Sequence, residues 1–276
     1  MKTLTILVLL QVSLTNLFGQ ADTTAQKVYS INLKAEGGGS LLFIGVSAVG
    51  FKKLDRVAAF DKEDVVNLDP NSVNAFDRSV IFLNPANYDR AQKRSDLFLN
   101  ISILSPLLLA ADKTIRKDWL DLVTLYVVTH AVDNAIYFAS AFSVRRARPF
   151  TYNPDVPLET KIGVAKSNSF YSGHVSFSST STFFLAKVFT DYHHIKGWKR
   201  IAIFTAASVS PALVAYNRME AGKHFKTDVM LGFAVGAASG ILIPQLHRQL
   251  KKSTVIGMHP YYSPFGQSGL VFNYKF

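Results

Sequence analysis

The sequence predicts an all-α protein, a bundle of five to six helices that spans a membrane and ends in a short β-hairpin-like tail. Of the 276 residues, 49% are apolar and only 18% are charged, a balance that excludes an intrinsically disordered polymer. Five long apolar segments fill the middle of the chain, and its last residues alternate as in a strand. The absence of cysteine excludes disulfide scaffolds, thiolate metal sites and cysteine nucleophiles.

The first 20 residues have the pattern of a secretory signal peptide. Lys2 precedes an apolar run from Leu4 to Leu10, and the small residue Gly19 suits a cleavage position. An uncleaved N-terminal anchor is the alternative interpretation. Either one delivers the following residues outside the cytoplasm.

Residues 21–94 are expected to form an N-terminal extension with peripheral helices. The stretch 21–39 is polar and ends in three glycines, which is typical of a leader or linker. The apolar stretch 40–50 is too short to span a bilayer, which needs about 20 residues. Residues 51–96 are charged and contain turn signals, which predicts a loop-rich region.

The main domain is expected over residues 95–247, where five apolar segments predict helices. They are Leu97–Ala111, Trp119–Val144, Val175–Phe189, Ile201–Tyr216 and Val229–Leu246. In the last segment Gly232, Gly236 and Gly240 recur at a spacing of four, which allows close contact with another helix. Residues 248–276 contain two β-leaning runs separated by Pro and Gly, which predicts the hairpin-like tail.

Three basic clusters follow alternate apolar segments. They are Lys113, Arg116 and Lys117, then Lys196, Lys199 and Arg200, then Arg248, Lys251 and Lys252. If all five segments span, these clusters lie on one face, as the positive-inside rule requires of the cytoplasmic side. The linkers 145–174 and 217–228 then lie on the exported face. A soluble periplasmic bundle of buried helices is the alternative.

Three polar clusters lie at helix ends in those two linkers. They are Arg145-Arg146-Ala147-Arg148-Pro149, Ser169-Phe170-Tyr171-Ser172-Gly173-His174, and the run from Asn217-Arg218 to Asp228. We refer to them as the first, second and third motif. Together they bring two histidines, an aspartate, several arginines and a Ser-Gly turn to one layer of the bundle.

These residue types suit the chemistry of a phosphate group. Arginine forks match phosphoryl oxygens, and Ser172-Gly173 at a helix start offers unpaired backbone N–H groups. His224 and Asp228 are four residues apart, so the carboxylate can hold one ring nitrogen and leave the other as a nucleophile or base. His174 can protonate a leaving alkoxide. No metal or cofactor is expected.

With these motifs the sequence resembles the type 2 phosphatidic acid phosphatase superfamily, which includes lipid phosphate phosphatases, bacterial non-specific acid phosphatases and vanadium haloperoxidases. The signature of that superfamily is Lys-x6-Arg-Pro, then Pro-Ser-Gly-His, then Ser-Arg-x5-His-x3-Asp. The chain matches it with Arg148-Pro149, Ser172-Gly173-His174 and Arg218-x5-His224-x3-Asp228, and the resemblance covers about residues 95–247.

The resemblance implies a role for each matched residue. His224 would attack phosphorus and form a phosphohistidine, Asp228 would orient it, and His174 would protonate the leaving group. The phosphoryl oxygens would be held by Arg148, Arg218, Ser172 and Gly173.

Three positions depart from the signature, since its Lys, Pro and Ser are replaced by Ala141, Tyr171 and Asn217. The loss of the lysine removes a cation from the transition state, so reduced activity is an open possibility. Arg145, one turn before Arg148, or Lys166 can replace that cation in space.

The expected function is a metal-independent phosphatase that hydrolyses a lipid phosphomonoester or diphosphate at the periplasmic face of the inner membrane. A soluble periplasmic acid phosphatase and a non-catalytic lipid-phosphate-binding envelope protein are the alternatives. The net charge of +11 indicates an anionic partner. Nucleic acid is not expected in that role, because the chain is predicted to be exported. The sequence carries no signal for an oligomeric state.

Overall fold

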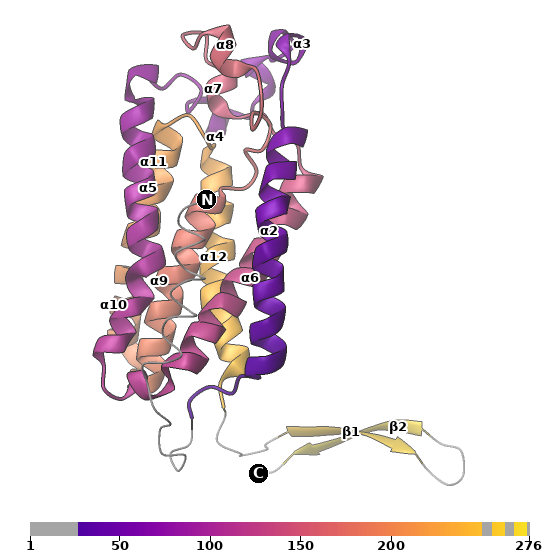
Figure 1. Cartoon of the computed structure of the whole chain (residues 1–276), viewed down its shortest axis with the longest axis vertical. Coiled ribbons are helices and arrows are strands. Elements are labelled where there is room, and N and C mark those ends of the chain that lie inside the picture. The colour runs from indigo at the N-terminus through magenta and orange to yellow at the C-terminus, as the bar shows by residue number, and fades with distance from the viewer. Residues whose placement is uncertain (1–26, 250–255, 263–267, 275–276) are drawn as a thin grey trace.

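A computed structural model describes residues 27–249, 256–262 and 268–274, which form a bundle of long helices and a two-stranded hairpin (Figure 1). The prediction of an all-α bundle with a β-hairpin in the tail is therefore confirmed. The predicted signal peptide, residues 1–20, lies outside the described residues.

The long helices run side by side along the bundle, and short helices and turns cluster at its ends (Figure 1). The long ones are α2 (Gly38–Val57), α5 (Tyr88–Leu104), α6 (Trp119–Ser143), α9 (Gly173–Tyr192), α10 (Gly197–Ala207), α11 (Val209–Glu220) and α12 (Lys226–His247). The short helices are α3 (Lys62–Val66), α4 (Ala75–Arg78), α7 (Pro149–Tyr152) and α8 (Leu158–Lys161). A π-helical turn covers Leu33–Gly37, and 3₁₀ turns cover Pro70–Ser72, Pro85–Asn87, Ser105–Ala111 and Ile115–Asp118.

Helices α9 and α12 pack closely along their length, as the glycine spacing predicts. A Cβ added at Gly232 would lie 2.6 Å from the carbonyl oxygen of Ser172. One at Gly240 would lie 2.5 Å from that of Thr180, and one at Gly236 would overlap Ser176. Only glycine permits this approach of two backbones, and the approach fixes the start of α9 against the start of α12.

The N-terminal part of the chain is more helical than its composition predicts. The expected loop-rich region 51–96 contains the end of α2 and the first half of α5. Helix α2 packs on α6, where Asn134 donates a hydrogen bond of 2.7 Å to Ser47. The charged residues of this region lie at one end of each helix, so they do not interrupt its apolar face.

The predicted helix Ile201–Tyr216 is divided at Ser208 into α10 and α11. The physical reason is Pro211, which has no N–H and fits only the first turn of a helix. The segment after α5 likewise tightens into a 3₁₀ turn that contains Pro106.

Three helical segments are long and apolar enough to cross a membrane: Pro85–Ala111, Ile115–Ser143 and Lys226–His247. Two of the five expected spans are not among them, because α9 is rich in Ser and Thr and the α10–α11 segment is broken. Large apolar side chains are exposed along the bundle, among them Leu97, Ile101, Leu104, Ile201 and Leu246. Such a belt is typical of a lipid-facing surface.

The basic loops lie at the end of the bundle opposite the short helices α3, α4, α7 and α8 (Figure 1). His193 contacts Asp112 at 2.8 Å, which joins the loop after α9 to the loop before α6. Arg200 and Arg248 both contact the buried carboxylate of Asp191, at 3.4 and 3.5 Å. The described members of the three basic clusters therefore share one end of the bundle, as predicted, and the three motifs occupy the other.

The tail forms an antiparallel hairpin of β1 (Ile256–Tyr262) and β2 (Ser268–Tyr274). Its register pairs Met258 with Phe272 and His259 with Val271.

Candidate active site

Backbone hydrogen bonds join the three motifs at one end of the bundle. The N–H of Arg148 donates to the carbonyl of Lys166 at 2.9 Å, beside a parallel bridge between Arg146 and Asn168. The N–H of Ser172 donates to the carbonyl of Asp228 at 3.1 Å, which joins the second motif to the third. Backbone hydrogen bonds alone thus hold together segments that lie far apart in the sequence.

Gly222 forms the turn that connects α11 to the third motif. Its φ of +63° is disfavoured for other residues, and an added Cβ would lie 2.9 Å from the ring of Tyr88 and 3.0 Å from Phe150. The carbonyl of Gly222 accepts a hydrogen bond of 3.0 Å from the N–H of Phe150. This turn therefore brings His224 beside Arg148 and the first motif.

His224 is buried, with 3% of its surface exposed, and its ring is fixed on both sides. Nδ1 lies 2.7 Å from the backbone carbonyl of Ser169, and Nε2 lies 3.5 Å from Nη2 of Arg218. Because a carbonyl oxygen can only accept, Nδ1 carries the proton and donates it to Ser169. Nε2 therefore holds a free lone pair directed toward the Arg218 guanidinium, as a nucleophile for a bound phosphate requires.

Asp228 is not the direct partner of His224 that the sequence spacing suggests. Its Oδ2 accepts hydrogen bonds from Ser169 Oγ at 2.6 Å and from the Phe225 N–H at 2.9 Å, and its Oδ1 contacts Arg146 at 2.5 Å. The carboxylate of Asp228 thus accepts a hydrogen bond at the N-terminus of α12 and forms an ion pair with Arg146. Asp228 therefore acts on His224 through Ser169. The carboxylate accepts a hydrogen bond from the Ser169 hydroxyl, and the Ser169 carbonyl accepts one from the imidazole.

Arg146 links two fully buried carboxylates beneath the site. Besides Asp228, its guanidinium contacts Asp77 at 2.7 Å and lies 4.2 Å from the centroid of the Phe225 ring. Asp77 also accepts hydrogen bonds from the hydroxyl of Thr227 at 2.6 Å and from its N–H at 3.0 Å. This network holds α4, the first motif and the start of α12 together.

His174 and Arg218 are joined through two residues of α5. His174 Nε2 lies 3.3 Å from Asp96, whose carboxylate accepts from the amide of Gln92 at 2.9 Å. The Oε1 of Gln92 accepts from Nη1 of Arg218 at 2.7 Å. Since Arg218 also faces His224, the two imidazoles belong to one connected site.

Several donors of the site have no partner among the described residues. The buried Nε of Arg218 and the buried hydroxyl of Ser172 form no hydrogen bond there. Arg148 donates its Nε to Asn168 at 3.0 Å. No side chain caps α9, so the N–H groups of its first turn, which begins at Gly173, add to the anion-binding donors.

The electrostatics of the site favour an anion. Burial and the charges of Arg218 and Arg148 lower the pKa of His224 well below its usual value. Burial and Arg218 also lower the pKa of His174 to about 4, although Asp96 acts in the opposite direction. Both imidazoles are therefore neutral at pH 7, because burial and the neighbouring arginines disfavour their charged forms.

Arg145 and Ala141 are not brought into this group. Arg145 is exposed and donates to the backbone carbonyl of Val57 at the end of α2. Ala141 is fully buried in an apolar cluster with Leu54, Tyr137 and Tyr171. Arg145 consequently has no described contact with the other predicted phosphate-binding residues.

Sequence reasoning missed five residues that the structure adds to the site. They are Gln92, Asp96, Arg146, Ser169 and Lys223. Three of these stand inside the motifs without an assigned role. The other two lie four apart on α5, a spacing that would have indicated a shared helical face had 88–96 been recognised as helix.

Two neutral imidazoles, two arginines and the uncapped start of α9 meet at one end of the bundle, an arrangement that can bind a phosphate group. Residues 122–252, which include all three motifs, match the model of the PAP2 superfamily. The matched part is a little under half of the chain, and it includes two of the three helical segments that are long and apolar enough to cross a membrane.

Two solved structures are similar to this chain. The first transmembrane PAP2 type phosphatidylglycerolphosphate phosphatase from Bacillus subtilis is 16% identical, with 79% of this chain and 98% of that chain covered and a TM-score of 0.40. LpxE from Aquifex aeolicus is 18% identical, with 62% of this chain and 96% of that chain covered and a TM-score of 0.43. No curated protein matches the sequence.

Proposed function

We propose that this protein hydrolyses a phosphate ester of a membrane lipid through a phosphohistidine formed on His224. The observation that carries the proposal is the 2.7 Å contact between His224 Nδ1 and the Ser169 carbonyl, from which the tautomer of the ring follows. Its Nδ1–H is bound by the Ser169 carbonyl, so the Nε2 lone pair is available on the side of Arg218. A buried imidazole with this arrangement is activated without a metal ion.

The reaction proceeds in two displacements at phosphorus. Nε2 of His224 attacks the phosphorus while the ester P–O bond breaks, and His174 gives its proton to the departing alkoxide. Water then attacks the phosphohistidine, His174 takes back a proton, and inorganic phosphate leaves with His224 restored. Arg148, Arg218 and the start of α9 hold the three equatorial oxygens.

The negative charge of the substrate helps His174 to hold the proton that it must donate. The pKa of His174 is about 4 without ligand, so few molecules carry the required proton at neutral pH. A bound phosphate dianion offsets the charge of Arg218 and therefore raises this pKa. Protonation of the general acid is in this way coupled to substrate binding.

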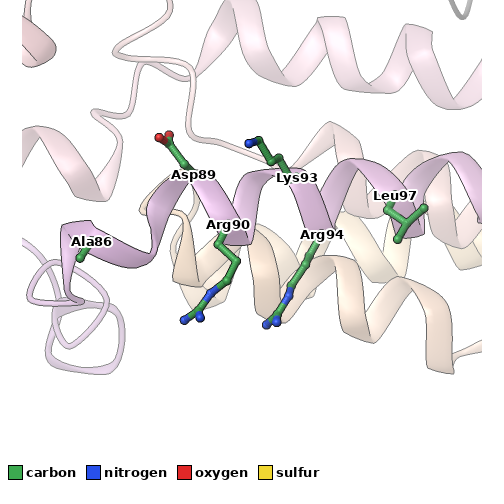
Figure 2. A pocket seen from close by; sticks show the side chains of 6 residues that line it. All are labelled: Ala86, Asp89, Arg90, Lys93, Arg94 and Leu97. Atoms are coloured by element: carbon green, nitrogen blue, oxygen red, sulfur yellow. The ribbon is translucent and has the colours of Figure 1, made fainter.

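The outward face of α5, the helix that carries Gln92 and Asp96, supports a lipid substrate. On α5 the basic side chains Arg90, Lys93 and Arg94 border a shallow hollow, and Figure 2 displays Arg90, Arg94 and Leu97 along one side of the helix. Exposed Leu97 and Ile101 follow one and two turns further along. A basic band directly above an apolar stripe is typical of a helix that crosses the boundary between headgroups and acyl chains.

We further propose that the site faces the periplasm from the inner membrane. The signal-like N-terminus and the shared end of the basic loops support this orientation. Cysteine introduced at Val164, near the site, should react with an impermeant maleimide in intact cells, and cysteine at Lys196 should not. The opposite labelling pattern would contradict the orientation.

The activity is tested with detergent-purified protein, a short-chain phosphatidic acid and EDTA. Phosphate release should be abolished in His224→Ala and retained in His193→Ala, a matched control at the opposite end of the bundle. Quenching in alkaline denaturant during turnover should trap acid-labile phosphate on the wild-type protein and none on His224→Ala, because the P–N bond of a phosphohistidine survives base and is hydrolysed by acid. No release above that of His224→Ala would leave the non-catalytic lipid-phosphate binder as the better description.

A further inference from the structure

The C-terminus of helix α2 is bound to the segment 163–169, which leads into the second motif. The carbonyl of Asp55 accepts a hydrogen bond of 2.9 Å from the N–H of Ala165, and the carbonyl of Ala58 accepts one of 2.7 Å from the N–H of Lys166. Both carbonyls lie where a helix ends, and the last carbonyls of a helix have no partner within it. The end of α2 therefore holds this segment through the main chain.

The same segment provides a hydrogen-bond partner to two groups of the candidate active site. The carbonyl of Ser169 accepts from Nδ1 of His224 at 2.7 Å, and Oδ1 of Asn168 accepts from Nε of Arg148 at 3.0 Å. The two terminal amino groups of Arg148 form no hydrogen bond with the described residues, so they are left for phosphoryl oxygens. The position of the segment therefore determines the positions of His224 and of one phosphate-binding arginine.

Asp55 holds the amide of Asn168 in the orientation that the contact with Arg148 needs. An arginine can only donate, so the oxygen of the amide must face the guanidinium and Nδ2 must face away from it. Oδ1 of Asp55 lies 3.4 Å from this Nδ2 and accepts a hydrogen bond from it. If the amide turned over, two donors would face each other at Arg148 and two acceptors would face each other at Asp55. The carboxylate thus fixes which end of the amide meets the arginine.

Asp55 also balances the charge of Arg148 without covering it. Burial lowers the pKa of Arg148, and the negative charges of Asp55 and Asp228 act in the opposite direction. Within the described part of the chain, Arg148 forms no direct ion pair with a carboxylate. A carboxylate in direct contact would occupy the donors that a phosphate needs, whereas one that acts through an intervening amide leaves them available.

We propose that Asp55 is a positioning residue of the phosphate site, which orients Arg148 through Asn168 and makes the end of α2 a part of the active site. This inference rests on the proposed function for the use of Arg148 in binding a phosphoryl group. Helix α2 ends at the same end of the bundle as the short helices α7 and α8 (Figure 1). It lies outside all three motifs, so the residue pattern around the reacting groups gives no indication of this role.

The contact is tested first by NMR spectroscopy of the full chain in detergent micelles, with isotope-labelled arginine, which needs no turnover. The Nε–H signal of Arg148 is assigned by its loss in Arg148→Lys. A hydrogen-bonded Nε–H exchanges slowly with water, so the signal should be sharp in the wild type and should shift or broaden in Asp55→Ala and in Asn168→Ala.

Two further variants complete this test. Asp55→Asn keeps the size of the side chain, but its amide no longer fixes which end of Asn168 faces it. It should therefore change the Arg148 signal in the same way, and it replaces Asp55→Ala if that variant does not fold. Glu63→Gln is the matched control, because it removes an exposed carboxylate from α3 at the same end of the bundle. An equal change of the signal in Glu63→Gln would overturn the proposal.

Kinetics with a short-chain phosphatidic acid separate positioning from stability. Asp55→Ala and Asn168→Ala should each lower kcat about tenfold or more and change KM less than about threefold, because a misplaced guanidinium loses most of its contact in the transition state. Since Asp55 acts through Asn168, the double variant should be no more than about twofold slower than Asn168→Ala. Multiplication of the two single effects, or an unchanged Arg148 signal in Asp55→Ala, would overturn the proposal even if the lipid is hydrolysed. Loss of the signal in both single variants of a protein that hydrolyses nothing would support the proposal and refute the phosphatase.

Discussion

Replacing Arg146 by Met should destabilise the protein, whereas the same change at its neighbour Arg145 should not. Arg146→Met leaves two buried carboxylates, Asp77 and Asp228, without their shared cation. Removal of one partner from a buried ion pair costs about 3–5 kcal/mol. Both carboxylates keep other hydrogen bonds, among them those from Thr227 and Ser169, so we expect about 3 kcal/mol, the lower end of that range.

The measurement is thermal unfolding of the purified variants in one detergent at one pH. For a chain of this size, a loss of about 3 kcal/mol lowers Tm by about 6–12 °C. Arg145→Met removes one exposed hydrogen bond, to the carbonyl of Val57, and should lower Tm by less than about 2 °C. Equal Tm values for the two variants would refute the reasoning, since Arg146 differs from Arg145 in its burial, its two carboxylate partners and its contact with the Phe225 ring.

Three further predictions concern packing, pH and catalysis. Gly236→Ala should lower the free energy of unfolding by about 1–3 kcal/mol, because the added Cβ overlaps Ser176. Gly45→Ala should leave it unchanged, because an added Cβ there meets nothing within 4 Å. Similar unfolding curves for the two variants would contradict the close packing of α9 and α12. The pKa of His174 is lowered in the folded protein, so the unfolded chain binds the proton more tightly. The Tm of the wild type should therefore fall as the pH drops from about 6.5 toward 4, and it should fall less in His174→Gln. Parallel curves of Tm against pH would argue against a lowered pKa of His174. His174→Ala should slow hydrolysis of alkyl phosphates far more than that of nitrophenyl phosphate, whose leaving group needs little protonation, and equal losses on both would exclude His174 as the acid.

The sequence by itself determined the features that depend on local pattern. Long apolar segments located the central helices, and the Gly232, Gly236 and Gly240 spacing indicated which face of α12 meets another backbone. The three motifs identified His174, His224 and the two arginines as a set, because residue type limits which groups can bind a phosphate. Charge runs in 51–96 obscured the helices there, since a helix whose charges gather at one end resembles a loop in composition.

Tertiary structure alone decided how those residues are used. A spacing of four places His224 and Asp228 near each other, but the carboxylate is drawn to the free N–H groups of α12 and to Arg146, and a backbone carbonyl from a distant segment holds the imidazole. Likewise, nothing in the sequence distinguishes Arg145 from Arg146 or marks Asp55 as a neighbour of Asn168. Hydrogen bonds and charges act through distances in space, and those distances are set by segments that meet only when the bundle has formed.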